Sequence, residues 1–287
     1  MIDLLYTIGL IFGMIAIGYL CGLFKILPVE TGDQLSKFVF TIAVPILLFR
    51  TMISADFGGS APWSLWGAYF AGVASTWALG SFLVRRIFNR DARAGVVAGL
   101  ASSFSNLVLL GIPLILGVFG PEGFEVLSLI ISVHLLIMML SSVILFEWAV
   151  RADGVQEGAV DLRSVAKRFA KNLFSNPIIV GVVAGWSWRL TGVPLPGFVD
   201  DLSMRLADVA GPVALFAMGL ALIKFGFKGN AQQALATTFS KLVFMPAVVL
   251  SCGLLLGLPP FILQVAVASA ALPTGANPYL IANHFGT

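Results

Sequence analysis

Long apolar runs separated by short polar breaks fill this chain from one end to the other. The runs are about 20 residues long and continuous, and they do not alternate between apolar and polar positions. This pattern is typical of membrane-spanning helices and not of the strands of a membrane barrel. We expect nine spans, at residues 3–24, 34–54, 63–86, 93–119, 122–149, 175–191, 200–224, 232–257 and 260–285.

The composition agrees with an integral membrane protein whose fold is entirely α-helical. Of the 287 residues, 59% are hydrophobic and 11% are charged, whereas a soluble domain is roughly 45–50% apolar and about 25% charged. The formal charge of +3 does not indicate nucleic-acid binding, because the basic residues lie in short loops between the spans. Cys21 and Cys252 lie in apolar runs without metal-ligand spacing. We therefore expect a lipid bilayer as partner, and no nucleic acid, metal or cofactor.

Basic residues gather in alternate loops and predict the orientation. They follow the third, fifth and seventh spans, as Arg85, Arg86, Arg90, Arg93, Arg151, Arg163, Lys167, Arg168, Lys171, Lys224 and Lys228. Loops rich in Lys and Arg stay in the cytoplasm. The N-terminus is then expected outside, and the long polar loop at 151–175 inside.

Similar segments recur at a nearly constant distance in the two halves of the chain. "LSKFVFTIAVPILLF" begins at Leu35, and "LSMRLADVAGPVALF" begins 167 residues later at Leu202. "GYLCGLFKILP" and "GWSWRLTGVP" are a second similar pair. Because the first half holds five spans, an odd number, the second half enters the membrane from the other side. We therefore expect an inverted repeat, with units at 1–150 and 176–287 joined by a cytoplasmic linker at 151–175.

Two apolar segments carry residues that interrupt a helix. They are "SNLVLLGIPLILGVFG" and "LPTGANPYLIANHFG", with Pro113 and Pro278 at comparable places. Proline inside a helix costs about 3 kcal/mol or more, and paired interrupted segments are the best sequence indication of a transporter's substrate site. We expect a helix break at each proline, whereas Pro45 and Pro212 are interpreted mainly as kinks. The expected substrate-binding residues are Asn106, Gly111, Pro113, Thr274, Gly275, Asn277 and Pro278.

At these motifs the sequence resembles the auxin efflux carrier family, bacterial members included. The resemblance implies ten helices in two inverted five-helix repeats, with the fourth and ninth helices broken and crossing, as in sodium/proton antiporters. It also implies a scaffold domain, a transport domain that moves by an elevator or rocking motion, and organic anions as cargo. In plants these are auxins; in bacteria, dicarboxylates such as malonate or malate are expected, at the inner membrane. A homodimer is left open.

The second repeat is expected to be incomplete. The chain stops at Thr287, just after the second crossing segment, where the family continues into a tenth helix. We interpret this as a truncation of about one span.

The distribution of acidic residues bears on the cargo. No Asp or Glu lies between Asp91 and Glu122, and none follows Asp208. Cation carriers of similar architecture need carboxylates at the crossing, whereas free N–H groups and positive helix ends suit a carboxylate cargo. Backbone carbonyls could still hold Na⁺, so sodium coupling is left open.

Three ionisable residues are candidates for a coupling or cavity charge, each with a structural alternative. His134 could titrate in a water-filled cavity or be a hydrogen-bonded packing residue. Asp208 could act in transport or pair with Arg205, three residues earlier. Lys241 could face the cavity or extend to the cytoplasmic surface.

The sequence favours a secondary carrier of small organic anions. The alternative is a sodium- or proton-coupled carrier of another substrate on the related inverted-repeat fold. An enzyme is not expected, because the HExxH and GxSxG motifs are absent, and a nucleotide-driven pump lacks its GxxxxGK[ST] motif. A channel would not explain two interrupted spans at matched places.

Overall fold

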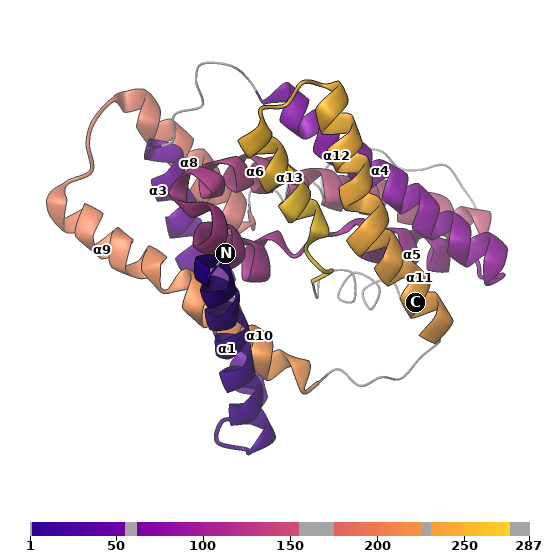
Figure 1. Ribbon diagram of the computed structural model, residues 1–287, viewed down its shortest axis with the longest axis horizontal. Coiled ribbons are helices and arrows are strands. Elements are labelled where there is room, and N and C mark those ends of the chain that lie inside the picture. Colours follow the sequence, from indigo (N-terminus) through magenta and orange to yellow (C-terminus); the bar gives the residue numbers. More distant parts are fainter. Residues whose placement is uncertain (1, 55–61, 155–174, 225–230, 276–287) are drawn as a thin grey trace. The chain divides into compact units, whose positions relative to one another are not determined.

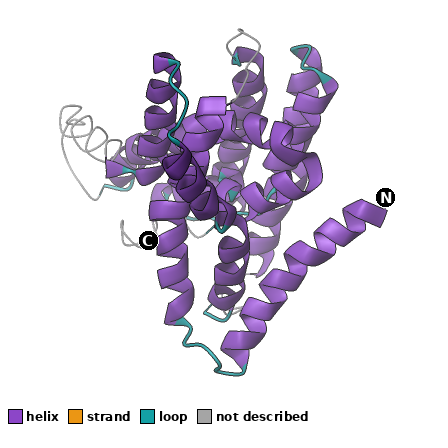
Figure 2. Cartoon of the chain, turned by 90° about the vertical axis from the view of Figure 1, so that its left-hand side faces the viewer, coloured by secondary structure: helices purple, strands orange, loops and turns teal. Residues whose placement is uncertain are grey.

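The computed structural model describes residues 2–54, 62–154, 175–224 and 231–275. Within these residues the chain is helical with short connections, and it contains no strand (Figure 2). Among the described residues, six helical segments are long and apolar enough to cross a membrane; they are Leu5–Leu23, Glu30–Ser54, Trp63–Ile87, Ala92–Ala152, Gly197–Leu222 and Ala231–Leu255. The all-helical membrane fold is therefore confirmed at this level, and the count of nine spans stays a prediction.

The chain forms two compact units, and each draws on both halves of the sequence. The first unit contains residues 1–60, 107–132 and 174–228, and the second contains 61–106, 133–173 and 229–287. The chain passes from one unit to the other inside the first interrupted segment, between Asn106 and Leu107. These are packing units and not sequence repeats, so the expected division at 150 and 176 stays a prediction.

Two helix pairs form much of the first unit. Its elements are α1 (Ile2–Leu23), α2 (Glu30–Phe38), the π-helical turn η1 (Val39–Ala43), α3 (Val44–Ser54), η3 (Leu107–Gly111), the first part of α6 (Ile112–Ala152), α8 (Pro177–Thr191), α9 (Gly197–Asp208) and α10 (Ala210–Leu222). Helix α1 packs along α10, and α3 packs along α8 (Figure 1).

Glycines allow both pairs to approach closely. A Cβ atom on Gly18 of α1 would overlap the backbone carbonyl of Phe216 in α10. A Cβ atom on Gly185 of α8 would overlap the backbone of Phe49 in α3. Small residues at such crossings are how membrane helices gain contact area, since lipid supplies no hydrophobic driving force between helices.

Helix α4 organises the second unit. The elements of this unit are α4 (Trp63–Phe82), η2 (Leu83–Ile87), α5 (Ala92–Ser103), the later part of α6, α11 (Ala231–Phe239), η4 (Ser240–Phe244), α12 (Met245–Leu255) and α13 (Pro260–Ala271). Helix α4 packs against α5, α12 and α13. The fully buried side chains of Tyr69 and Leu100 lie in this packing.

Helix α6 contains a bend at Gly120, where the sequence predicts a boundary between two spans. Gly120 has φ 69° and ψ −168°, and Pro121 follows it. A backbone with positive φ is strained for residues with a side chain but open to glycine. The 41 residues assigned to α6 therefore form two helical stretches that meet at this glycine.

Candidate functional site

The first interrupted segment breaks at residues 104–106 and not at Pro113. Helix α5 ends at Ser103, and Phe104 has extended backbone angles, φ −79° and ψ 110°. Residues 104–106 are not helical. Pro113 is instead the second residue of α6. The expected break at Pro113 is thus corrected to a break at residues 104–106.

A π-helical turn explains how the helix accommodates Pro113. Proline has no N–H and clashes with the preceding turn, so the backbone just before it cannot keep regular α-helical hydrogen bonding. The turn η3 ends at Gly111, two residues before Pro113. The turns η1 and η4 end two residues before Pro45 and Pro246 in the same way. In these three places the proline widens one turn and the helix continues.

The second interrupted segment begins where α13 ends. Leu272 follows the helix with φ −62° and ψ 139°, an extended conformation. The carbonyl oxygen of Pro273 accepts a hydrogen bond of 2.9 Å from the backbone N–H of Asn106. The hydroxyl of Thr274 donates to the carbonyl oxygen of Ala101 near the end of α5. The ends of α5 and α13 are therefore joined directly.

The structure brings together three of the residues expected to bind substrate. A Cβ atom on Gly275 would lie 3.3–3.5 Å from side-chain atoms of Asn106, and Thr274 is the neighbour that bonds to α5. Asn106, Thr274 and Gly275 thus form one cluster in the second unit, which we call the crossing cluster.

The remaining expected residues do not belong to the crossing cluster. Gly111 and Pro113 lie in the first unit, where Gly111 is buried and Pro113 packs beside Gly211 of α10. Asn277 and Pro278 lie outside the described residues. Their expected part in the site stays a prediction.

The three ionisable candidates differ in their surroundings. Lys241 is buried with 2% of its surface exposed, and its ammonium donates to the carbonyl oxygen of Ala270. It does not extend to the surface, so that expectation is wrong. Asp208 is exposed at the end of α9 and forms no ion pair with Arg205 among the described contacts. The expected local pair is therefore absent from the structure.

His134 is buried in an aromatic environment. Its ring lies 5.0 Å from that of Phe104, 5.7 Å from that of Tyr69 and 6.3 Å from that of Phe70, measured between centroids. Neither ring nitrogen has a hydrogen-bond partner within the described part of the chain. His134 is thus packed by aromatic rings rather than held by hydrogen bonds, and it abuts the break through Phe104.

A cavity of about 490 Å³ lies along α5 and α11, and Asn106, Thr274 and Gly275 of the crossing cluster are not among its lining residues. Ala101, the acceptor of the Thr274 hydroxyl, lines one part of it, and Arg90 and Arg93 line another. Arg93 pairs with Asp91 and Asp153, whereas Arg90 forms no ion pair within the described residues. In the sequence these arginines indicate only the orientation, and no pattern there marks them as cavity residues.

Two carboxylates hold the beginning of α5 beside this cavity. Asp91 accepts from the N–H of Ala94 at 2.8 Å, and Asp153 accepts from the N–H groups of Ala92 and Arg93 at 2.8 and 3.0 Å. Burial raises the pKa of Asp153, but these backbone donors and the Arg93 guanidinium outweigh it and hold the pKa below 3.8. The carboxylate satisfies N–H groups that have no partner inside the helix.

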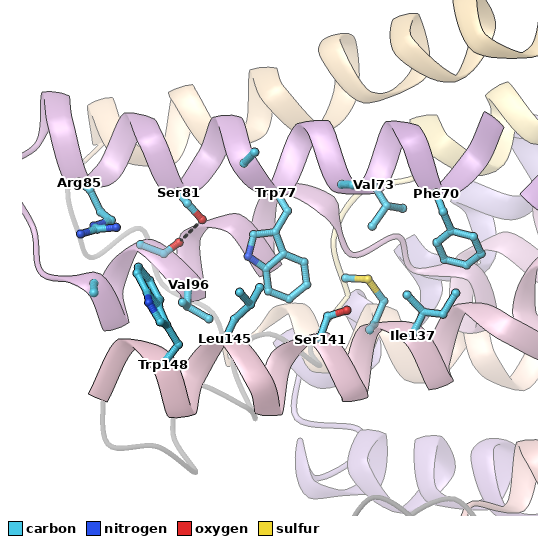
Figure 3. A pocket seen from close by; sticks show the side chains of 15 residues that line it. Phe70, Val73, Trp77, Ser81, Arg85, Val96, Ile137, Ser141, Leu145 and Trp148 are labelled. Atoms are coloured by element: carbon cyan, nitrogen blue, oxygen red, sulfur yellow. Dashed lines mark hydrogen bonds between the residues drawn. The ribbon is translucent and has the colours of Figure 1, made fainter. Parts of the chain in front are cut away.

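A second cavity, of about 460 Å³, lies between α4, α5 and α6, and its lining includes neither a residue of the crossing cluster nor Ala101. Figure 3 shows Trp77 among its mostly apolar side chains, with Arg85 and Trp148 at one end. The guanidinium carbon of Arg85 lies 5.3 Å from the ring centroid of Trp148. This cavity suits an apolar group better than a small carboxylate.

Comparison with known proteins places the chain in a family. The sequence profile of the family described as "Membrane transport protein" matches residues 5–287. A protein of Rhizobium meliloti (strain 1021), named "Putative malonate transporter", is 28% identical, and the match covers 96% of this chain and 84% of that protein. "Uncharacterized transporter YfdV" of Escherichia coli (strain K12) is 26% identical, with 94% and 84% covered. "Auxin efflux carrier component 8" of Arabidopsis thaliana is 24% identical, with 66% and 63% covered. The expected resemblance is confirmed, and the chain belongs to the membrane transport protein family that includes the auxin efflux carriers.

Proposed function

We propose that this multi-pass membrane protein is a secondary carrier of small organic anions, mono- or dicarboxylates such as malonate or malate, that works by alternating access. The observation that carries the proposal is the crossing cluster, in which two interrupted segments meet and Thr274 is bonded to Ala101, a residue that lines a cavity. The name of the Rhizobium meliloti relative supports a dicarboxylate as cargo.

The polar groups of the crossing cluster suit a carboxylate. An amide such as that of Asn106 supplies two N–H donors, whereas the one hydroxyl proton of Thr274 is already donated to Ala101. No Asp or Glu is among the buried side chains that the structure describes. A carboxylate that reaches the cluster therefore meets donors without a buried like charge to repel it.

Arg90 is the residue that we expect to attract the anion. Its exposed side chain lines the cavity, and a charged cleft raises the local concentration of an oppositely charged substrate. On the positive-inside rule this end of α5 faces the cytoplasm. We accordingly propose the bacterial inner membrane, with the N-terminus outside and residues 151–175 in the cytoplasm.

Matched contacts in the first unit support the proposed inverted repeat. Gly18 precedes Gly185, and Phe49 precedes Phe216, by the same 167 residues that separate the similar segments. Gly18 packs on Phe216, and Gly185 packs on Phe49. An inverted repeat with a two-fold axis would relate these two contacts to each other.

Two ion pairs involve acidic residues that are separated by the same 167 residues. Asp200 lies 167 residues after Asp33. The carboxylate of Asp33 pairs with Lys224 after the end of α10, and that of Asp200 pairs with Arg50 near the end of α3 at 2.5 Å. Each acid thus ties the beginning of one helical span to the end of its counterpart in the other half.

Transport by the purified chain in proteoliposomes tests the proposal. We expect saturable uptake of radiolabelled malonate or malate, accelerated by unlabelled dicarboxylate inside the vesicle, because a carrier exchanges cargo and a channel does not. Competition by amines or metal cations, without competition by carboxylates, would contradict an anion carrier.

A matched pair of arginine variants tests the route of the anion. Arg90→Gln is expected to raise KM for the anion at low ionic strength, and added salt should reduce the difference because it screens exposed charges. Arg86→Gln, which removes an exposed charge that does not line the cavity, is the control. Equal effects of the two substitutions would show that only the general surface charge matters.

A further inference from the structure

Lys241 is the one buried lysine or arginine among the side chains that the structure describes. It lies in the turn η4, inside the apolar span Ala231–Leu255. Its ammonium donates to the carbonyl oxygen of Ala270 and lies 3.3 Å from the sulfur of Met245. A lysine at such a depth is costly unless a negative group compensates its charge.

No carboxylate compensates this charge among the described residues. The buried polar and charged side chains in that part of the chain are serines, Thr76, His134 and Lys241 itself. The negative partner must therefore come from the backbone. Ala270 is the residue before the last in α13, where carbonyl groups have no partner inside the helix.

The helix end that Lys241 contacts is joined to the end of a second helix. Helix α13 ends at Ala271 and helix α5 ends at Ser103. The bond from Thr274 to Ala101 and the bond from Asn106 to Pro273 hold the two ends together. Each helix C-terminus carries about half a negative elementary charge. Two of them sum to about one, which a single ammonium group neutralises.

We infer that the Lys241 ammonium is a built-in cation, fixed in a site that would otherwise bind a small monovalent cation such as Na⁺. In carriers with broken helices, half-helix C-terminal ends and unwound carbonyls are the groups that coordinate Na⁺. Here the ammonium occupies such a carbonyl end and is covalently attached, so this site needs no exchangeable ion. This inference concerns the cation site and does not depend on which cargo the protein carries.

Removing the lysine side chain beyond Cβ opens the site. Lys241→Ala leaves a space that propylammonium matches atom for atom, because the missing groups are three carbons and the ammonium nitrogen. 1-Propanol nearly matches this ligand in shape and carries no charge. Lys241→Met removes the charge but fills the space, and so it is the matched control variant.

Thermal unfolding of the full chain in detergent is the first test. The apparent Tm of Lys241→Ala should be lower than that of the wild type. Propylammonium and Na⁺ should raise it in a saturable way, since a ligand of the folded state stabilises it by mass action. Choline of equal ionic strength and 1-propanol should not. The wild type and Lys241→Met should respond to none of them.

Two outcomes would overturn the inference. If 1-propanol restores Lys241→Ala as well as propylammonium does, the side chain serves packing and not charge. If folded Lys241→Ala, checked by size-exclusion chromatography, responds to no cation, there is no cation site. Because this measurement uses no cargo, its failure would leave the proposed transport function untouched.

A second variant covers the case in which Lys241→Ala does not fold. Lys241→Gln keeps a hydrogen-bond donor for Ala270 and removes the charge. In proteoliposomes we expect it to lose most of the wild-type uptake, and Na⁺ should not restore the loss, because glutamine fills the space as methionine does. Wild-type uptake by Lys241→Gln without Na⁺ would mean that the hydrogen bond alone is needed, which contradicts the inference.

Discussion

Asn106 shows how one residue can be held by a distant part of the chain. Its backbone N–H donates to Pro273, and its side chain lies against Gly275. A larger residue at position 275 would press on the Asn106 side chain, and glycine avoids this close contact because it has no Cβ. An amide held in this way can present its donors to a cargo without first being ordered.

Replacing Asn106 with alanine should weaken anion transport without unfolding the protein. A hydrogen bond to a charged group contributes about 1.5–3 kcal/mol, so the apparent affinity should fall by roughly tenfold to a hundredfold. Uptake as a function of malonate concentration measures this. Ser251→Ala, which removes an exposed hydroxyl on α12, is the control. An Asn106→Ala variant with wild-type affinity would contradict a role in binding.

The sequence indicated that certain residues of the interrupted segments lie close together, but it did not indicate the surroundings of the ionisable residues. Asn106, Thr274 and Gly275 were expected together, because interrupted motifs mark themselves by composition. The surroundings of Lys241 and Asp208 were not, because spacing along one helix does not tell which helix lies opposite. Lys241 is held by a carbonyl of α13, about 30 positions along the chain.

At the scale of elements, the position of a proline did not predict the position of the helix break directly. Helix ends and the bend at Gly120 lie close to the predicted boundaries. The break itself lies several residues before Pro113, because one widened turn absorbs the lost hydrogen bond of a proline. The contacts that stabilise the break come from Pro273 and Thr274, and no local pattern could reveal them.

The beginning of α5 depends on Asp153, a residue from the end of α6. Asp153→Asn should destabilise the protein at neutral pH by about 1 kcal/mol, because the amide keeps one acceptor oxygen but loses the charge and the second oxygen that bond to Arg93. Because its pKa is lowered in the folded state, the wild-type carboxylate stabilises the fold fully above pH 3.8. That contribution is lost as the pH falls further, through the lower folded-state pKa.

Apparent Tm measured across pH checks this dependence. The difference between the wild type and Asp153→Asn should be constant near neutral pH and shrink below about pH 4. Glu147→Gln, which removes a half-exposed pair with Arg151 one turn away in the same helix, should have a smaller effect, since such pairs contribute little. A Tm difference that grows on acidification would contradict the assignment.

At the scale of the whole molecule, the pairing of equivalent contacts is the main consequence of the proposed repeat. Gly18 on Phe216 and Gly185 on Phe49 would be one contact used twice, and so would the ion pairs of Asp33 and Asp200. Sequence comparison within the chain predicted that these segments are equivalent. It could not predict which of them touch, because an inverted repeat fixes the symmetry of the contacts but not their partners.

The two glycine contacts should therefore respond to substitution in the same way. Alanine is a better helix former than glycine by about 0.8–1.0 kcal/mol, so Gly13→Ala, on a part of α1 with no heavy atom within 4 Å of the new Cβ, should leave the apparent Tm equal or raise it. Gly18→Ala and Gly185→Ala should lower it by similar amounts, because each new methyl group overlaps the backbone of the opposing helix. The double variant should lose roughly the sum, since the two contacts share no residue. If Gly18→Ala and Gly185→Ala were as stable as Gly13→Ala, the close packing at these two crossings would be wrong, and with it the support that these contacts give to the repeat.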